Sequence, residues 1–340
     1  MLMETKLSIV HLLLTTLILA CFYAEIEAAT THKHGHHQGE RLEDGAYRPR
    51  DLDHHGADGE HMTEFDHEAM LGSVKEAEEF HQLSPEESKQ RLKLLVTSKI
   101  DTNKDGFVDK HELKAHILRS FKSLSEEESN DRFDEVDENN DEVVTWTEYL
   151  KEMYDMDSED DPGVKVPVGL ESENKLLIAD DKQVFEAADL NKDGQLNREE
   201  FVLFISPEEH PVMLPIILNQ TLRDKDTDKD GIISFQEYLG ESARDHDKAW
   251  LIAEKERFDS EHDKDGDGLL NENEILSWIV PSNDDVATDE VNHLFAAADG
   301  DQDDRLNYDE IIDNHDLFVG SEATDYGDHL QNIDKFRDEL

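Results

Sequence analysis

Apolar residues recur every three or four positions on both sides of a polar stretch that begins near residue 100. Before it they are Leu92, Leu95, Val96 and Ile100, and after it they are Leu113, Ile117, Leu118 and Phe121. This spacing places each set on one face of an amphipathic helix. We interpret both faces as core rather than as a groove for a partner, and we predict a helix–loop–helix unit.

Helix-start signals support this reading at three places. Ser84 is followed by Pro85 and, three residues after the serine, by Glu87, which is a capping box with proline at the first helical position. Similar boxes begin at Ser125 and at Ser206. They predict that new helices start there, ahead of further polar loops.

The polar loop recurs six times, always over twelve residues: Asp101–Glu112, Asp137–Glu148, Asp189–Glu200, Asp226–Glu237, Asp263–Glu274 and Asp299–Glu310. Every copy has Asp first, Asp or Asn third, Asp fifth, an apolar residue eighth and Glu twelfth. That is the spacing of an EF-hand calcium loop. The predicted fold class is therefore all-α, with six EF-hand helix–loop–helix motifs in three pairs and short strand pairing between loops. We expect the eighth residues to pair across those strands.

Calcium is a hard cation that takes about six to eight oxygen ligands in a flexible geometry, which explains the acidic and amide residues at these positions. The seventh residue supplies its backbone carbonyl, and the ninth acts through water. The predicted ligands are Asp101, Asn103, Asp105, Phe107, Asp109 and Glu112; Asp137, Asn139, Asp141, Val143 and Glu148; Asp189, Asn191, Asp193, Gln195 and Glu200; Asp226, Asp228, Asp230, Ile232 and Glu237; Asp263, Asp265, Asp267, Leu269 and Glu274; and Asp299, Asp301, Asp303, Arg305 and Glu310.

The sixth loop residue should be glycine, because the sharp turn needs a positive φ. Four loops comply, with Gly106, Gly194, Gly231 and Gly268. The second loop has Glu142 and the sixth has Asp304. Glutamate in the left-handed region costs roughly 1–2 kcal/mol, whereas aspartate tolerates it better. We predict up to six calcium ions, with the second site weakest and the sixth intermediate.

The loop spacing divides the chain. Successive loops start 36 or 37 residues apart, except for 52 residues after the second loop, where an acidic run is followed by Pro and Gly. This composition is typical of a linker. We therefore predict that loops one and two, three and four, and five and six form the pairs. The predicted segments are a signal peptide at 1–24 (cleavage between 20 and 29), a disordered His-rich segment at 25–70, pair one–two at 71–155, the linker at 156–175, pair three–four at 176–245, pair five–six at 246–320, and a C-terminal tail at 321–340.

Composition narrows the possible partners. The formal net charge is −52, which disfavours nucleic acid and anionic lipid. Low hydrophobic content favours several small cores over one large core. Residues 30–81 hold nine of the eighteen histidines, including His32, His34, His36 and His37. Such a cluster can bind zinc or copper, but we favour a solvated tail because no fixed scaffold supports a site.

The two ends of the chain indicate a compartment. Leu7–Phe22 is an apolar run after Lys6, which is typical of a secretory signal peptide, and the only cysteine, Cys21, lies within it. After cleavage we expect no membrane insertion. The last four residues are Arg337, Asp338, Glu339 and Leu340, and they resemble the retrieval signals of the endoplasmic reticulum. Asn219 begins a glycosylation sequon that would be usable in that lumen.

Signal peptide, six EF-hands and this ending together resemble the CREC family of reticulocalbins and calumenins, and the ending favours a reticulocalbin. Sequence stretches that carry the resemblance are Val144–Tyr149, Asp259–Asp267, Asp316–Phe318 and Ser321–Gly327. The resemblance implies a low-affinity, multi-site calcium-binding protein of the endoplasmic reticulum lumen without catalytic activity. Its implied partners are a retrieval receptor and luminal client proteins.

Two functions remain open on this evidence, a calcium buffer with a calcium-stabilised scaffold, and a calcium-dependent chaperone or client-binding regulator. A calmodulin-type sensor is disfavoured, because sensors expose a Met-rich groove and Met153, Met156 and Met213 do not repeat between pairs. An enzyme is disfavoured because the sequence has no nucleophile elbow, phosphate loop or zinc-protease helix.

Overall fold

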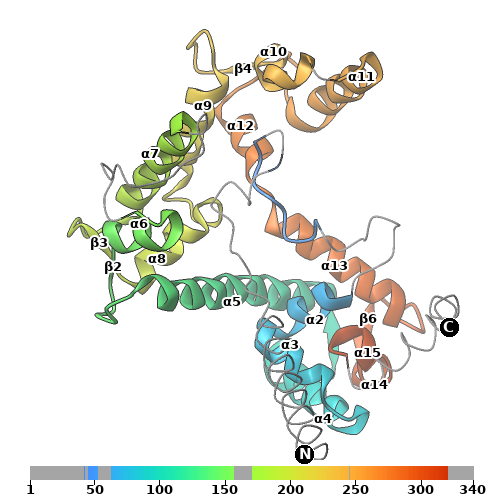
Figure 1. The fold of residues 1–340 in the computed structure, drawn as a ribbon. Helices are drawn as coiled ribbons and strands as arrows, with labels where there is room; N and C mark the ends of the chain where they lie inside the picture. Colours follow the sequence, from blue (N-terminus) through green and yellow to red (C-terminus); the bar gives the residue numbers. More distant parts are fainter. Residues whose placement is uncertain (1–41, 43–44, 53–62, 157–170, 245, 321–340) are drawn as a thin grey trace, which may run out of the picture. The chain divides into compact units, whose positions relative to one another are not determined.

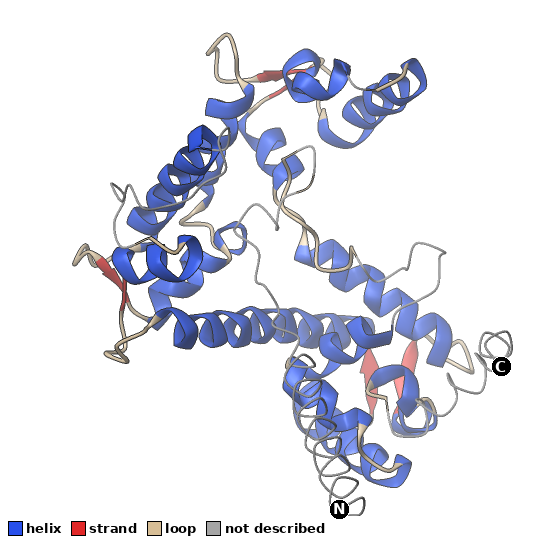
Figure 2. Ribbon diagram, in the orientation of Figure 1, coloured by secondary structure: helices blue, strands red, loops and turns tan. Residues whose placement is uncertain are grey.

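The structure is a computed structural model, and it describes residues 42, 45–52, 63–156, 171–244 and 246–320. The predicted fold class is confirmed: helices dominate, and short two-stranded sheets join the loops (Figures 1 and 2). The helices are α2 (Thr63–Leu71), α3 (Val74–His81), α4 (Pro85–Leu95), α5 (Lys110–Val136), α6 (Trp146–Tyr154), α7 (Glu171–Ala188), α8 (Arg198–Ile205), α9 (Leu214–Lys225), α10 (Phe235–Leu239), α11 (Lys248–Arg257), α12 (Glu272–Ile279), α13 (Asn283–Ala298), α14 (Tyr308–Asp313) and α15 (His315–Phe318).

Shorter helical turns are η2 (Val96–Ile100), η3 (Pro207–Glu209), η4 (Gly240–Arg244) and η5 (Phe258–His262). The strands are β1 (Phe107–Asp109), β2 (Val144–Thr145), β3 (Gln195–Leu196), β4 (Ile233–Ser234), β5 (Leu269–Leu270) and β6 (Arg305–Asn307). Each strand lies in one calcium loop, so the strand partners tell which loops form a pair.

The predicted pairing of the loops is wrong. The antiparallel partners are β1 with β6, β2 with β3, and β4 with β5, so the first loop pairs with the sixth, the second with the third, and the fourth with the fifth. The eighth residues do face one another across each sheet, as predicted, and all are fully buried: Val108 with Leu306, Val144 with Leu196, and Ile233 with Leu270.

Helix α5 explains why the first two loops do not pair. It is continuous over 27 residues from Lys110 to Val136, which corresponds to a length of about 40 Å at 1.5 Å per residue. The first loop precedes this helix and the second follows it (Figure 1). Two loops held at opposite ends of one rigid helix cannot share a sheet, so each takes its partner from elsewhere in the chain.

The helix starts predicted from capping boxes have mixed outcomes. Ser84 is the N-cap of α4, and its side chain accepts the amide of Glu87 as predicted. Ser125 instead lies inside α5, where its hydroxyl bonds Glu209 at 2.6 Å, so the predicted helix start there is wrong. Ser206 precedes only the short turn η3 and makes no side-chain capping bond.

Two predicted boundaries also differ. Thr63–Leu71 forms α2 within the segment predicted as disordered, and Ala46 and Tyr47 are buried, with the Tyr47 amide donating to the Ile279 carbonyl at 2.8 Å. Helix α7 begins at Glu171, inside the predicted linker. The signal peptide, most of the linker and the C-terminal tail lie outside the described residues.

Among the described residues, three apolar clusters form the interior, as the low hydrophobic content predicted. One joins α2–α5 with α13–α15 around the β1–β6 pair, another surrounds β4–β5, and the third surrounds β2–β3. The first cluster contains Phe80 and Phe121 from early in the chain and Phe295 and Phe318 from late in it. Each strand pair therefore has a core of its own, and the first core is assembled from both ends of the described chain.

Candidate metal centres

All six loops share one backbone geometry at their first and sixth residues. The first-position carboxylate accepts the amide hydrogen of the sixth residue at 2.8–3.1 Å in every loop. The loops with Glu142 and Asp304 make this bond at 3.0 and 3.1 Å, so they fold as the glycine loops do. The second and sixth loops therefore keep the EF-hand turn despite the missing glycine.

The left-handed backbone predicted for the sixth residue is present. Glycines at that position have φ of 84° to 89°, whereas Glu142 and Asp304 have 67° and 61°. The fourth residue is left-handed as well, which sequence reasoning missed. It is Lys104, Asn140, Lys192, Lys229, Gly266 and Gln302 in the six loops. Only the fifth loop has glycine at both left-handed positions, so it carries the least backbone strain.

The ninth and twelfth residues also build the outgoing helix. The ninth is the N-cap and the twelfth is the third helical residue of a capping box in all six loops, with N-caps Asp109, Thr145, Asn197, Ser234, Asn271 and Asn307. Glu112 also accepts the backbone amides of Thr102 and Asn103 at 3.0 and 3.2 Å. Glu148 instead accepts the side-chain amide of Asn139 at 2.7 Å. The twelfth residue is thus fixed against the start of its loop.

Acidic oxygens converge in the last three loops. One oxygen from each member lies within 4.8 Å of the others in three groups: Asp226, Asp228 and Glu237; Asp263, Asp265 and Glu274; and Asp299, Asp301 and Asp303. Loss of solvation and then the charge of Asp230 raise the pKa of Asp228, and loss of solvation and then Asp303 raise that of Asp301. Bringing these carboxylates together is unfavourable by itself, and a divalent cation would relieve the repulsion.

Hydrogen bonds and ion pairs connect the two loops of a pair. Tyr308, from the sixth hand, donates its hydroxyl to Asp101 Oδ2 of the first loop at 2.5 Å. This bond raises the pKa of Tyr308 to about 12. Lys110 of the first loop lies 3.3 Å from Asp304 of the sixth. The first calcium loop is therefore held in part by residues about 200 positions away.

The donor set fits calcium. Side-chain donors at positions one, three, five and twelve are oxygen in all six loops, because they are Asp, Asn and Glu throughout. Residues at position seven, predicted to use their carbonyls, lie at or just before the strands. Each loop therefore contains a full set of oxygen ligands for one ion. The roles of the individual residues as ligands stay predictions.

The predicted glycosylation site, retrieval signal and histidine cluster all lie outside the calcium loops. Asn219 is exposed on α9, while Thr221 of its sequon is buried and donates its hydroxyl to the Ile217 carbonyl at 3.0 Å. Glycosylation of Asn219 stays a prediction. The retrieval signal at residues 337–340 and the clustered histidines at 32–37 are outside the described residues. None of the helices in the described part of the chain has the length and apolar composition that a membrane span requires.

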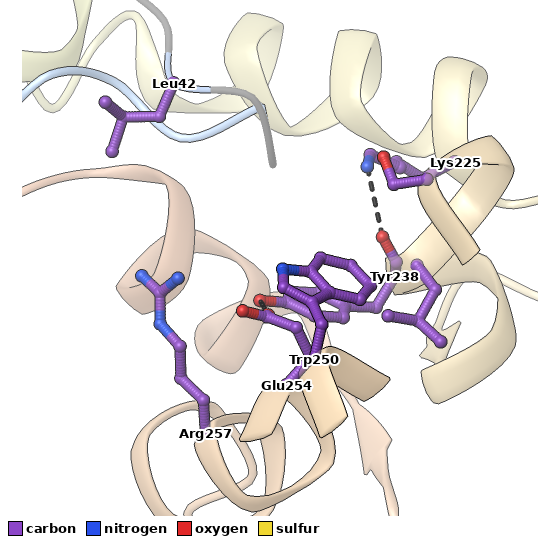
Figure 3. Close-up of a pocket in the computed structure, with 8 residues that line it drawn as sticks. Leu42, Lys225, Tyr238, Trp250, Glu254 and Arg257 are labelled. Carbon is purple, nitrogen blue, oxygen red and sulfur yellow. Dashed lines mark hydrogen bonds between the residues drawn. The ribbon is translucent and has the colours of Figure 1, made fainter. Parts of the chain in front are cut away.

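A pocket of about 270 Å³ is lined by residues of α9, α10, η4 and α11 together with Leu42 (Figure 3). It combines apolar and charged side chains, with Leu42, Leu239, Tyr238 and Trp250 beside Lys225, Ser242, Glu254 and Arg257. The Tyr238 hydroxyl donates to Glu254 at 2.8 Å, and the Lys225 ammonium donates to the Tyr238 carbonyl at 3.2 Å. None of its lining residues is a predicted calcium ligand, although Lys225 and Tyr238 directly precede and follow the fourth loop.

Comparison with known proteins agrees with this geometry. The EF-hand domain pair family matches residues 98–154 and 178–241. Each match spans two consecutive loops, although the hydrogen bonds join other loops, because a sequence match records order along the chain and not strand partners. Reticulocalbin-2 of Crotalus adamanteus is 40% identical over 286 residues, covering 83% of this chain and 93% of that protein. Reticulocalbin-2 of Mus musculus is 38% identical over 300 residues, covering 87% and 93%.

Proposed function

Because this chain belongs to the CREC family of reticulocalbin-like EF-hand calcium-binding proteins, which are not enzymes, we propose that it is a low-affinity calcium buffer and calcium-stabilised scaffold of the endoplasmic reticulum lumen. Luminal calcium is high, so sites with dissociation constants of about 10⁻⁴–10⁻³ M would fill and empty there. Up to six ions would bind, with the fifth site least strained and the second most strained.

The observation that carries this proposal is the convergence of acidic oxygens in a repeated loop geometry. Acids held within 4.8 Å of one another in the last three loops repel, and calcium turns that repulsion into attraction. Six calcium ions would add about 12 positive charges to a chain of net charge −52. Calcium binding should therefore also compact the chain, which is the scaffold part of the proposal.

Calorimetric titration of the full chain with calcium tests the buffer proposal. At least four ions should bind in the millimolar range. Glu112→Gln and Glu237→Gln should each abolish one site and leave the others, because each removes a carboxylate oxygen from a single loop. Binding of fewer than four ions by the parent protein would refute the proposal.

The luminal location rests on the two ends of the sequence. The retrieval receptor is the partner that the ending Arg337–Leu340 implies. Deletion of Leu340 should send the protein into the medium of secreting cells, while the parent stays inside. Equal retention of both proteins would show that this ending does not set the location.

A second candidate function, calcium-dependent binding of luminal clients, is favoured by the pocket of Figure 3. Its aromatic and charged lining, from α9, α10, η4 and α11, suits a peptide that carries both apolar and charged groups. Trp250→Ala should lower calcium-dependent recovery of luminal proteins in a pulldown. Glu112→Gln, which changes a loop of another pair, is the matched control. If both variants recover as much as the parent, this second function is wrong.

A further inference from the structure

The last described segment, His315–Gly320, docks on helices from the beginning of the described chain. Helix α15 packs against α2 and α4 (Figure 1). Phe318 and Val319 have no exposed surface there. The buried hydroxyl of Ser88, on α4, donates to the Gly320 carbonyl at 2.8 Å. The segment is thus held by apolar packing and by polar bonds, and the predicted tail at 321–340 follows it directly.

Two histidines fasten this segment in series. His67, on α2, is 2% exposed, and its Nε2 lies 2.9 Å from the Asp316 carbonyl oxygen. Its Nδ1 lies 2.9 Å from Nε2 of His81, on α3. A carbonyl only accepts, so Nε2 of His67 carries the hydrogen, and in a neutral ring Nδ1 then accepts from His81. The hydrogen bonds therefore run from His81 through His67 to the backbone of α15.

The pair can hold one extra proton but not two. With one added proton, a single hydrogen still lies between the two rings, because one of the two facing nitrogens keeps its lone pair. With two, both nitrogens of the 2.9 Å contact carry hydrogens, and two positive charges face each other. The contact between His67 and His81 must then open.

Gly320 leaves the two rings little room to part. An added Cβ at this residue would lie 2.8 Å from His67 Cε1 and 3.1 Å from His81 Cδ2. The Gly320 backbone therefore rests directly against both rings, and its φ of 68° also suits glycine. Rings that separate would displace Gly320, and with it the bond to Ser88.

We propose that His67 and His81 form an acid-sensitive latch, which holds His315–Gly320 on α2–α4 at neutral pH and releases it when both rings are protonated. Histidine clusters that gain protons at about pH 5–6 switch interfaces in this way. None of these residues is a predicted calcium ligand, so the latch goes beyond the calcium function. It gives the protein a second input besides calcium, which is the acidity of its compartment.

The groups around His67 set the direction of the pH dependence. Burial lowers the pKa of His67 below its ordinary 6.5, against the raising effect of the bond to the Asp316 carbonyl. The charge of His81 lowers this pKa further, whereas Asp66 and Glu64 raise it. Because the docked pKa lies below the ordinary one, docking is fully stable above pH 6.5 and weakens as pH falls below that value.

Two other histidines lie near the segment and must be separated from the latch. Burial, and then the charge of Lys89 on α4, lower the pKa of His315, while Asp316 raises it. Neither ring nitrogen of His315 has a hydrogen-bond partner among the described residues. From α5, Nε2 of His116 lies 2.7 Å from the Met70 carbonyl oxygen on α2. The test therefore replaces His315 in every protein compared and keeps His116 in all of them.

The test measures hydrogen exchange of the full chain with His315→Gln in saturating calcium, at about pH 7.5 and about pH 5.5. The amides of Leu317 and Val319 donate to the carbonyls of residues 314 and 315 at 3.0 and 2.9 Å. A released segment this short would lose these bonds. Protection of both amides, relative to a free peptide at the same pH, should fall several-fold and at most about tenfold in acid. The amide of Phe201, in another core, should keep its protection and exclude global unfolding.

His81→Gln removes one of the two protonation sites, while its amide can still donate to His67. This variant should keep the segment docked and lose the pH response. Gly320→Ala should release the segment even at neutral pH, because its Cβ has no room. Ser88→Ala is the matched control: it loses a bond that does not titrate, so protection should fall by the same factor at both pH values.

Equal protection of the two amides at both pH values in the background protein would overturn the proposal. A pH response in His81→Gln as large as that of the background protein would overturn it as well, because burial of His67 alone would then explain the response.

Discussion

Glu142→Gly in the second loop should tighten that site. Glu142 is held at φ 67° by the turn, and its amide donates to Asp137 at 3.0 Å as the glycine amides do in other loops. A residue with a Cβ costs about 1–2 kcal/mol in the left-handed region, and glycine costs nothing comparable. The loop imposes that strain when it is ordered around the ion, so its removal favours the bound state.

One contact that the substitution would remove should reduce the expected gain in calcium affinity. Arg198 Nε donates to Glu142 Oε2 at 3.1 Å across the β2–β3 pair, and glycine would remove this ion pair. The side chains are 37% and 74% exposed, so the pair contributes at most about 1 kcal/mol and is weakened by salt. The expected net effect is about 1 kcal/mol, which is roughly fivefold tighter binding.

Trp146 can report the pair formed by the second and third loops. It is the tenth residue of the second loop and the first residue of α6, and it stacks on Tyr149 with ring centroids 5.4 Å apart. In a background with Trp250→Phe and Trp278→Phe, tryptophan fluorescence during a calcium titration follows only the second and third loops. Glu142→Ala is the matched control, because it also loses the ion pair but keeps a Cβ in the left-handed region. Equal affinities of the glycine and alanine variants would refute backbone strain as the limit.

Three further predictions test the structure. Tyr308→Phe removes the bond to Asp101 and should lower the free energy of unfolding in calcium by about 1.5–3 kcal/mol, measured by urea denaturation; an unchanged value would contradict a role for that bond. Burial lowers the pKa of His116 to about 4, below its ordinary 6.5, so stability should fall as pH drops from 6.5 to 4, by at most about 3 kcal/mol. His116→Gln should flatten this loss in acid titrations followed by circular dichroism, and an identical profile would sink the assignment. Cysteines replacing Phe107 and Asn307, which are strand partners, should form a disulfide on mild oxidation, whereas a pair placed across the first two loops should not.

The local features of the calcium loops were predictable from sequence. Ligand spacing, the apolar eighth residue and the strained turns at Glu142 and Asp304 all follow from interactions within one twelve-residue segment. The left-handed fourth position was not predicted, because Lys104, Asn140 and Gln302 carry no glycine signal there. In those loops the hydrogen bonds of the turn hold the fourth residue at a positive φ, against its intrinsic preference for a negative φ.

The burial of the Asp66 and Glu290 side chains was also missed, for a different reason. Asp66 lies in a segment predicted as disordered, and Glu290 looks like one acid among many on a surface helix. Their burial depends on α2 and α13 both packing on α5 in one core, although these two helices are more than 200 residues apart in sequence. In a chain with 85 acidic residues, composition cannot distinguish a buried acid from a solvated one.

Strand pairing changes which sites should act together. With consecutive pairing, the third and fourth loops would be the pair in which both loops have glycine at position six. With the observed pairs, it is the fourth and fifth, and each compromised loop instead joins a loop with glycine at position six. In both of those pairs the acid at position six meets a base at position ten of its partner: Glu142 with Arg198, and Asp304 with Lys110.

The fourth and fifth loops, with glycine at position six in both, have Phe235 and Glu272 at position ten and no base there. A cation at position ten therefore occurs opposite an acidic sixth residue and is absent from the pair that has none. The observed partners satisfy this correspondence in every pair, whereas consecutive pairing would satisfy it only for Lys110 and Glu142, and would leave Arg198 opposite Gly231 and Glu272 opposite Asp304. The charge pattern and the backbone hydrogen bonds thus favour the same partners, and the fourth and fifth loops should form the tightest calcium-binding pair.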